Sequence, residues 1–285
     1  MITDFSFDGT TLSEMGYMLC DFSGNTEETL EVSVMDYTDI KAPLSDKSHK
    51  VATSYPNNYS RTLQVCKMDC NNPDTDLILT DEDISAMARW LCKKEYKWFN
   101  WDKEEYYTTI QGEKVLDTNK VVYYKAHCKM SKIVFGGECH GLEITIETNA
   151  PYGFTKQYSV TNTGSSLTID LRNICDEVGY IYPIQVSMYS QNSSGTYGLR
   201  NTSDNNRMTS ITNCTAGDNI YILCDDVQQI YTDSLAHYNF YRDFNYIFPR
   251  LLTTTPNNYV ITLNGTPTSD ISVQFDYRCI RKVGL

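Results

Sequence analysis

TDEDISAMARWL, residues Thr80–Leu91, decides the architecture, because it is the one stretch with a clear helical pattern. Thr80 is suited to cap the first turn, and Asp83 stands three residues later, as in a capping box. Apolar residues then recur at helical spacing, so one stripe faces a core. They are Ile84, Met87, Ala88 and Leu91. Outward from this helix the sequence indicates strands and turns, which predicts a mostly β protein with one principal helix.

Length and composition predict two ordinary globular domains. The chain has 285 residues, more than the roughly 100–200 of a single domain, and 41% are hydrophobic. No apolar run approaches the roughly 20 residues that span a bilayer, so we expect no membrane insertion. The first ten residues lack the basic and apolar parts of a secretory signal, so we expect none.

The net charge and the cysteines further restrict the class of protein that the sequence predicts. The net charge of −12, without a basic stripe, argues against binding nucleic acid by neutralising its phosphates. The ten cysteines are scattered through the chain, and without an export signal we expect reduced thiols, many of them buried.

The two halves differ in composition. Residues 1–152 hold 15 Lys and Arg against 25 Asp and Glu, a formal charge of −10, whereas residues 153–285 hold 9 against 11, a charge of −2. Asn, Ser, Thr and Tyr dominate the polar surface of the second half. Asn149–Gly153, with a Pro and a Gly, lies at the change. We therefore predict domains at 1–152 and 153–285.

Strand patterns occur in both halves. In the first half they are Leu30–Met35, Val121–Ala126 and Leu142–Glu147, with a turn at Gly136-Gly137, which indicates an antiparallel sheet partly covered by the helix. The second half alternates around Val186, Asn219–Cys224, Ile261 and Val273, with turn signals that include Asn264-Gly265. Short strands at this spacing predict a sandwich or jelly roll.

Catalytic and metal motifs are largely missing from the sequence. It has no Gly-rich phosphate loop, no G-x-S-x-G and no H-E-x-x-H. Six cysteines and histidines allow two interpretations, a structural zinc site or buried thiols. We favour buried thiols, so we expect no metal or cofactor. The residues concerned are Cys66, Cys70, His127, Cys128, Cys139 and His140. Glu104-Glu105 beside Trp98 and Trp101 could suggest a glycosidase cleft, but we favour a charged aromatic hairpin, because spacing in the sequence does not fix carboxylates in space. We therefore expect no enzyme.

One aromatic cluster in the second half is the candidate contact patch. Tyr and Arg are favoured at contact surfaces and also stack on sugars. Its members are Tyr238, Phe240, Tyr241, Arg242, Phe244 and Tyr246. The sequence leaves two interpretations open: a patch for a protein or a glycan, or a loop that packs its Phe residues inward. A carbohydrate-binding β-sandwich is accordingly the alternative function.

In order and spacing these segments resemble the distal tail protein (Dit) family of long-tailed bacteriophages. The opening Phe5–Gly9 followed by Gly16–Leu19, the helix ending Ala88–Leu91, and Leu142–Thr148 followed by Ala150–Tyr152 are similar to that family's first domain. Ala216–Ile222, and Phe248–Leu252 followed by Pro256–Ile261, are similar to its second.

The resemblance implies a structural protein of the viral tail. It implies a β-sandwich-like ring domain with a helix and hairpin at the N-terminus and a galectin-like β-sandwich at the C-terminus. Copies would form a homo-hexameric ring, the baseplate hub, at the tail tip of the virion, assembled in the bacterial host cytoplasm. The partners implied are the tail tube protein, the tail-tip hub protein and fibre or receptor-binding proteins, with DNA as cargo through the bore.

Two features of the sequence agree with that expectation. An acidic first half suits a bore whose walls repel phosphates. A ring of identical subunits needs two different complementary surfaces on each one. The polar stretch Tyr37–Ser60 is a candidate arm to a neighbour, and a disordered loop is the alternative.

Overall fold

The structure is a computed structural model of the chain. It describes residues 4–22, 35–41, 46–55, 57–68, 77–101, 106–108, 114–116, 121–233 and 239–283. Four sequence predictions fall wholly or largely outside these residues: the strand at Leu30–Met35, the pair Glu104-Glu105, Cys70 and Tyr238. The described part of the chain is mostly β with two helices, which confirms the predicted fold class. Neither of these helices has the length and hydropathy to cross a bilayer.

The chain divides into two compact units, each with its own hydrophobic core. Unit 1 comprises Met1–Thr155 and Arg281–Leu285, and unit 2 comprises Lys156–Ile280. The chain therefore passes from one unit to the other twice, and its C-terminal residues return to unit 1.

A large antiparallel sheet forms the body of unit 1. Its strand order is β2-β1-β7-β10-β11-β6-β3; in addition, β12 pairs with β10, and β25 pairs with β12. The other strands of the unit form two-stranded sheets, β4–β5 and β8–β9. The strands are β1 (Phe5–Phe7), β2 (Thr10–Thr11), β3 (Tyr17–Cys20), β4 (Asp36–Lys41), β5 (Ser48–Ser54), β6 (Ser60–Lys67), β7 (Lys97–Trp101), β8 (Tyr106–Thr108), β9 (Lys114–Leu116), β10 (Tyr123–Phe135), β11 (Glu138–Thr148), β12 (Gly153–Phe154) and β25 (Ile280–Arg281).

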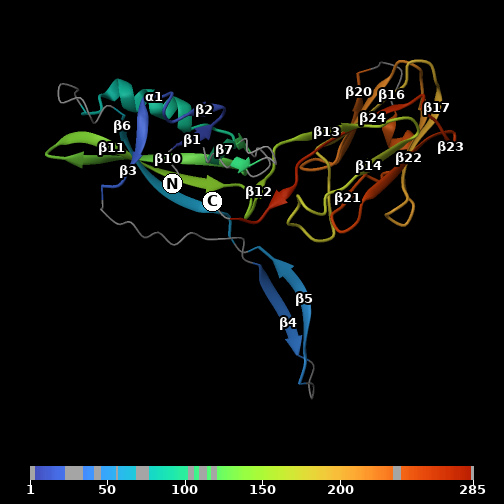
Figure 1. The fold of residues 1–285 in the computed structure, drawn as a ribbon, viewed down its shortest axis with the longest axis horizontal. Helices are drawn as coiled ribbons and strands as arrows, with labels where there is room; N and C mark the ends of the chain where they lie inside the picture. Colours follow the sequence, from blue (N-terminus) through green and yellow to red (C-terminus); the bar gives the residue numbers. More distant parts are fainter. Residues whose placement is uncertain are drawn as a thin grey trace. The chain divides into compact units, whose positions relative to one another are not determined.

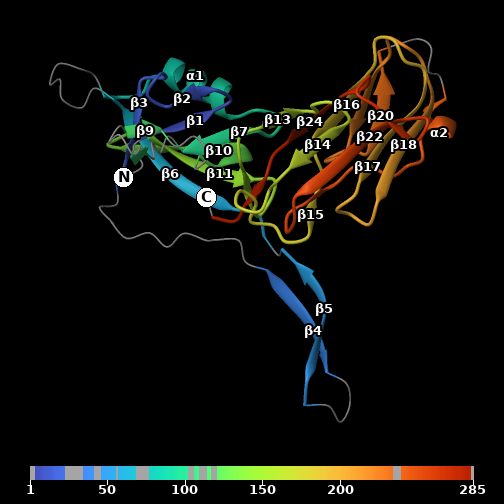
Figure 2. The same cartoon turned by 45° about the vertical axis from the view of Figure 1, so that its right-hand side comes forward.

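The predicted helix is α1 (Asp81–Leu91), and it lies over one face of this sheet (Figures 1 and 2). Its capping box is complete, because Asp83 N donates to Thr80 Oγ1 (3.2 Å) and Thr80 N donates to Asp83 Oδ2 (2.8 Å). Lys67 of β6 adds an ion pair to the same carboxylate at 2.8 Å. This contact holds the pKa of Asp83 below its usual value and fastens the start of the helix to the sheet.

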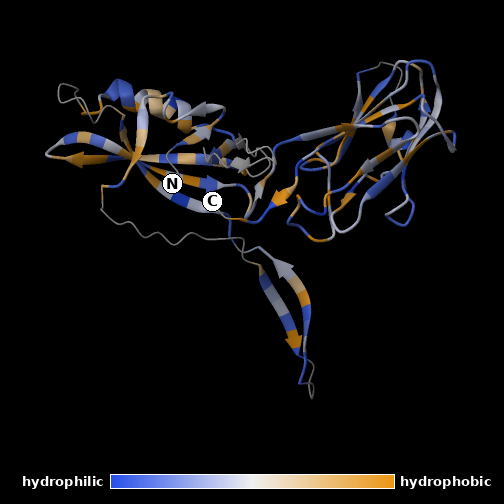
Figure 3. Cartoon of the chain, in the orientation of Figure 1, coloured by the Kyte–Doolittle hydropathy of each residue, from blue (hydrophilic) through white to orange (hydrophobic). Residues whose placement is uncertain are grey.

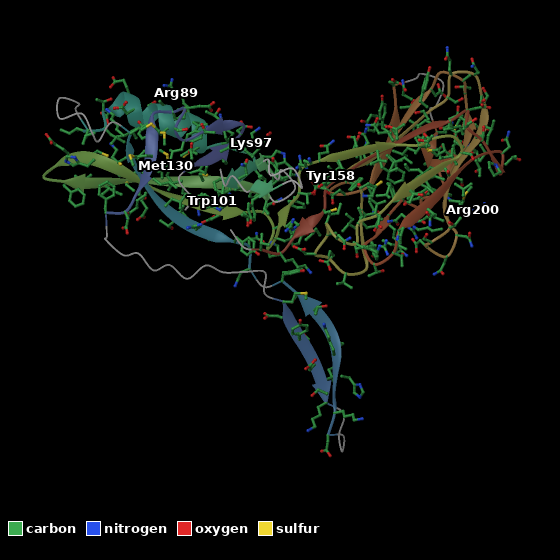
Figure 4. The ribbon with its side chains drawn as sticks, in the orientation of Figure 1. Arg89, Lys97, Trp101, Met130, Tyr158 and Arg200 are labelled. Atoms are coloured by element: carbon green, nitrogen blue, oxygen red, sulfur yellow. The ribbon has the colours of Figure 1, made fainter. Side chains whose placement is uncertain are left out.

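The face of α1 that the sheet buries is slightly rotated from the predicted one. Met87, Trp90 and Leu91 are buried, whereas Ile84 and Ala88 are only half-buried. Trp90 stacks on Phe5 with ring centroids 5.7 Å apart, and its Nε1–H donates to the carbonyl of Phe7 at 2.9 Å. Arg89 lies on the exposed side of the helix (Figure 4).

The predicted strand Leu142–Glu147 belongs to β11, and its apolar residues point into the core of unit 1. Leu142, Ile144 and Ile146 are fully buried. Gly136 and Gly137 form the predicted turn between β10 and β11, and both have positive φ (63° and 96°), which favours glycine. These residues share one core with Met87, Trp90 and Leu91 of α1, so the core lies on the helix side of the sheet.

Unit 2 is a sandwich of two five-stranded antiparallel sheets with its core between them. One sheet has the order β13-β24-β16-β19-β20, and the other has the order β14-β22-β17-β18 with β23 beside β22. The elements are β13 (Tyr158–Thr161), β14 (Ser166–Ile169), β15 (Tyr180–Ile181), β16 (Gln185–Tyr189), β17 (Gly195–Asn201), β18 (Arg207–Cys214), β19 (Asn219–Leu223), β20 (Gln229–Thr232), α2 (Phe240–Asp243), β21 (Leu251–Leu252), β22 (Asn257–Leu263), β23 (Thr266–Pro267) and β24 (Ser272–Tyr277).

The alternating patterns of the second half lie on the strands that they predict. Val186, Ile220, Ile261 and Val273 are fully buried, and each comes from a different strand of the sandwich. The turn at Asn264-Gly265 has positive φ at both residues (51° and 82°), as a tight hairpin turn requires. These local signals account for β16, β19, β22 and β24, and the other strands of unit 2 were not predicted.

Candidate contact surfaces

The predicted aromatic patch divides between the core and the surface of unit 2. Phe244 is 3% exposed and packs against Phe248 at 5.1 Å, and Phe240 is half-buried against the same core. By contrast, Tyr241 and Tyr246 are 61% and 59% exposed. The first patch residue, Tyr238, lies outside the described residues. The Phe residues therefore anchor this segment and the tyrosines remain on the surface, and binding by the exposed tyrosines stays a prediction.

Polar contacts fasten this segment to strand β18, beside which α2 lies (Figure 2). Asn213 Nδ2 donates to Asp243 Oδ1 at 2.7 Å, and Asn245 Nδ2 donates to the carbonyl of Met208 at 2.8 Å. Tyr246 has φ 57°, which is unusual for a bulky residue and points to a constrained conformation. Arg242 is exposed, and its guanidinium lies 5.4 Å from the ring of Tyr241. The exposed part of the patch is therefore Tyr241, Arg242 and Tyr246.

A second surface is the β4–β5 hairpin, which the sequence indicated only as a polar stretch. Its two strands pair with each other alone, and every described residue in them is exposed. Tyr37, Ile40 and Val51 are 57%, 57% and 59% exposed, and Figure 3 shows apolar residues in both strands. Lys50 lies 4.0 Å from the ring centroid of Tyr37. An isolated two-stranded hairpin is marginally stable in water, so this one has the character of an element that needs a partner.

A third surface is an open, mostly apolar hollow in unit 1 of about 380 Å³. Phe22 and Phe135 line it with ring centroids 5.9 Å apart, and both are exposed. Cys66, Lys67, Leu77 and His140 complete the lining. Of these lining residues, Lys67 forms an ion pair with Asp83.

The proposed zinc ligands are not brought together in the described residues. His127 and Cys128 point to opposite faces of β10, because side chains alternate along a strand. His127 Nε2 lies 2.9 Å from Glu147 Oε2, whereas Cys128 is buried in the core, which raises its pKa to about 12. Within the described ranges no group of three or more potential ligands occurs. Cys70 lies outside them.

One polar contact in unit 2 was not found from the sequence. Arg250 binds Asp204 through two hydrogen bonds, Nε to Oδ2 at 2.7 Å and Nη2 to Oδ1 at 2.9 Å, and its guanidinium lies 4.3 Å from the ring of Tyr180. Asp204 is 6% exposed, and the hydrogen bonds from Arg250 hold the pKa of its carboxyl below the usual value. No sequence signal links residues 46 positions apart. The pair joins two distant segments of unit 2.

Unit 1 is thus a helix-covered sheet and unit 2 a β-sandwich, and both carry exposed apolar or aromatic side chains. The sequence matches a family described as the phage tail protein N-terminal domain over residues 1–150, and one described as the phage tail C-terminal domain over residues 152–277. The chain therefore belongs to this family of phage tail proteins. No curated protein matches it.

The fold is similar to that of a particular tail protein, the SPP1 Dit (gp 19.1) protein, described as a paradigm of the hub adsorption apparatus in phages that infect Gram-positive bacteria. The similarity covers 98% of this chain and 99% of that chain, with a TM-score of 0.59 at 10% sequence identity. At this identity the likeness establishes the shared fold. It agrees with the resemblance that the sequence motifs indicated.

Proposed function

We propose that this chain is a phage distal tail protein, whose copies close into a ring, a homo-hexamer, at the tail tip. The ring would join the tail tube to the tail-tip hub protein and to fibre or receptor-binding proteins, after assembly in the bacterial host cytoplasm. In this role the protein is a structural connector and converts no substrate. The observation that carries the proposal is the shared fold with SPP1 Dit over nearly the whole of both chains, within a family of phage tail proteins.

The β4–β5 hairpin is the element that we propose reaches a neighbouring subunit. A closed ring needs head-to-tail contacts between two different surfaces of the same chain. The hairpin supplies one such surface, since it exposes Tyr37, Ile40 and Val51 and pairs with no other strand of the described chain. Burial of these side chains against a second copy would supply the stabilisation that a lone hairpin lacks.

Native mass measurement and electron microscopy of the purified protein, alone and with its tail tube protein, test the ring. We expect closed rings for the wild type and single subunits for the double variant Ile40→Asp with Val51→Asp. The matched control is Ser48→Asp, which adds charge to a polar, exposed position of the same hairpin and should leave the rings intact. A wild-type protein that stays a single subunit in both samples contradicts the proposal.

Unit 2 is proposed to face other tail components through Tyr241, Arg242 and Tyr246. Exposed Tyr and Arg side chains held on an anchored segment are typical of contact hot spots. We expect the double variant Tyr241→Ala with Tyr246→Ala to lose binding to a fibre or tail-tip protein in a pull-down, while Val178→Ala, at another exposed site of unit 2, retains it. Equal binding by both variants would exclude this patch.

The acidic N-terminal half supports passage of DNA without retention. Its formal charge of −10 repels phosphates, whereas a protein that holds DNA presents clustered Lys and Arg. A structure of the assembled ring tests this point. A bore lined by Lys and Arg would contradict it.

Saccharide binding is the second candidate function, and one observation favours it. Tyr221 and Tyr231 stack on neighbouring strands of the β13-β24-β16-β19-β20 sheet, with ring centroids 4.9 Å apart, and Tyr231 is 40% exposed. Ser187 pairs with Tyr221 and Gln274 pairs with Ser187, so hydroxyl and amide groups continue the same row. No strand of this sheet contains Lys or Arg. Such a face suits a neutral, polyhydroxylated ligand.

A glycan array followed by calorimetry with cell-wall polysaccharide tests this second candidate. We expect Tyr231→Ala to abolish any signal, and Tyr241→Ala, an exposed tyrosine on α2, to preserve it. An array without signal for the wild type excludes saccharide binding by this face and leaves the ring proposal untouched.

A further inference from the structure

Two cysteines of unit 2 meet where the chain leaves that unit. Cys175 lies in the loop after β14, and Cys279 lies between β24 and β25. Asp176 N donates to the carbonyl of Ile280 at 2.9 Å, which brings the two segments side by side. The Cys279 thiol donates a hydrogen bond to Cys175 Sγ, and the backbone N–H groups of Glu177 and Ile280 also donate to this sulfur. Neither residue is part of a disulfide in this structure.

The two thiols differ in their access to solvent and in their reactivity. Cys279 is fully buried, whereas Cys175 is half-buried against the edge of the same core. The hydrogen bond from Cys279, together with the two backbone donors, lowers the pKa of Cys175 to about 7. By contrast, burial raises the pKa of Cys214 and of Cys224, in the same unit, to about 12. The lowered pKa favours the thiolate of Cys175, which is the nucleophilic form.

We propose that Cys175 and Cys279 form a redox-active pair, which closes to an intramolecular disulfide when the protein leaves a reducing compartment. The oxidant is a disulfide of low molecular weight, of the glutathione disulfide class. The accessible Cys175 reacts first, and the buried Cys279 resolves the intermediate. Because Cys279 already contacts Cys175, the second step needs only a short approach of the two sulfurs, to about 2.05 Å.

The chemistry balances in two exchange steps. The Cys175 thiolate attacks one sulfur of the oxidant, a mixed disulfide forms, and the other half of the oxidant leaves as a thiolate. Cys279 then loses its proton to solvent and attacks the Cys175 sulfur. The Cys175–Cys279 bond forms and the second half of the oxidant leaves as a thiolate. Two protein thiols are oxidised, and the oxidant is reduced to two thiols.

The bond would close a loop that contains most of unit 2. Closing a long loop restricts the unfolded chain and stabilises the folded one. It would also tie the loop at Cys175 to the last residues before β25, where the chain returns to unit 1. The proposal does not depend on ring formation, since both thiols belong to one chain.

Incubation of the full-length protein in glutathione buffers, followed by quenching with an alkylating agent and peptide mass mapping, tests the proposal. In excess glutathione disulfide we expect the peptides that carry Cys175 and Cys279 to be joined, and in excess reduced glutathione we expect both to be alkylated. The melting temperature of unit 2 should rise by about 5 °C or more on oxidation.

Variants show whether the bond is specific. Cys175→Ser should abolish both the joined peptides and the rise in melting temperature, whereas Cys92→Ser, at an exposed cysteine of unit 1, should change neither. If Cys279→Ser fails to fold, peptide mapping of the wild-type protein in the glutathione buffers still tests whether the bond forms. The proposal is overturned if the two peptides stay separate in excess glutathione disulfide, if another cysteine replaces either partner, or if the bond persists in excess reduced glutathione.

Discussion

Trp90 is the side chain that joins the helix of unit 1 to its sheet. It stacks on Phe5, and its Nε1–H donates to Phe7 O at 2.9 Å. We predict that Trp90→Phe lowers the free energy of unfolding by about 2–3 kcal/mol, because the carbonyl of Phe7 loses its partner and a cavity remains. Denaturant titration measures the change. Trp98→Phe, at a half-buried position of β7, is the control, and an equal loss in both variants would contradict a special role for Trp90.

In unit 2 the two hydrogen bonds from Arg250 to Asp204 join segments that are distant in the sequence. Asp204→Asn should destabilise the protein by about 2–3 kcal/mol at pH 7, because it removes the charge from two hydrogen bonds to a guanidinium. The exposed pair Asp170 and Arg172 offers a matched control, since Asp170→Asn removes only a surface ion pair and should cost much less than Asp204→Asn.

The pH dependence of this difference follows from the lowered pKa of Asp204. The unfolded chain, in which the carboxyl has a pKa of about 3.9, takes up the proton first as the pH falls. The stabilisation is therefore fully present above about pH 5, and it is lost as the pH falls through the lower pKa of the folded state. Unfolding of wild type and Asp204→Asn should converge in strongly acidic buffer. A gap that is constant down to that range would contradict the assignment.

At the residue scale the sequence predicts which side chains are buried better than it predicts which ones touch. Leu142, Ile144 and Ile146 follow from alternation alone. The apolar stripe that helical spacing predicts does not include Trp90. Trp90 is buried because it packs on Phe5 and Phe7, which lie far away in the sequence. The pairing of Cys175 with Cys279 among ten cysteines is equally hidden, since spacing does not fix connectivity.

At the scale of elements, the cap of α1 is the clearest local signal. Thr80→Ala should cost about 1 kcal/mol, because the N–H of Asp83 loses its acceptor, and Thr80→Ser should cost little since the hydroxyl remains. Thermal unfolding of the two variants measures the difference. Equal losses would mean that Lys67, through its ion pair with Asp83, holds the helix start by itself.

Strands and turns with local signals were predictable, and the order in which strands pair was not. The β10–β11 hairpin follows from its flanking alternation and from Gly136-Gly137. The sheet order β2-β1-β7-β10-β11-β6-β3 depends on contacts between distant segments, about which local periodicity carries no information. The β4–β5 hairpin was missed as a strand pair because neither of its faces is buried, and a register shift after Thr38 disturbs its alternation.

For the candidate contact patch, too, the composition was predictable from the sequence and the contacts were not. The cluster from Phe240 to Tyr246 was recognisable by composition, because Tyr and Arg are enriched at contacts. Its division into anchoring and exposed side chains depends on the edge of β18, which holds Asp243 and Asn245 through side-chain hydrogen bonds. The stacked pair Tyr221 and Tyr231 was not singled out, since the two residues come together only through strand pairing.

At the scale of the whole molecule, two separate cores predict two unfolding transitions. The core of unit 1 contains Trp90, and the core of unit 2 lies beside Asp204. In calorimetry Trp90→Phe should lower the temperature of one transition and Asp204→Asn that of the other, by about 2–8 °C for each kcal/mol lost. If both variants shift one merged transition, the units do not unfold independently.

The dependence of these transition temperatures on protein concentration tests the proposed ring. Subunits that associate through the β4–β5 hairpin of unit 1 are stabilised by mass action, so the transition lowered by Trp90→Phe should rise in temperature with protein concentration. The transition lowered by Asp204→Asn should stay fixed. The variant Ile40→Asp with Val51→Asp should remove the concentration dependence, because the association surface is lost. A unit 1 transition that is independent of concentration in the wild type would show that the rings, if they form, are not held through this unit.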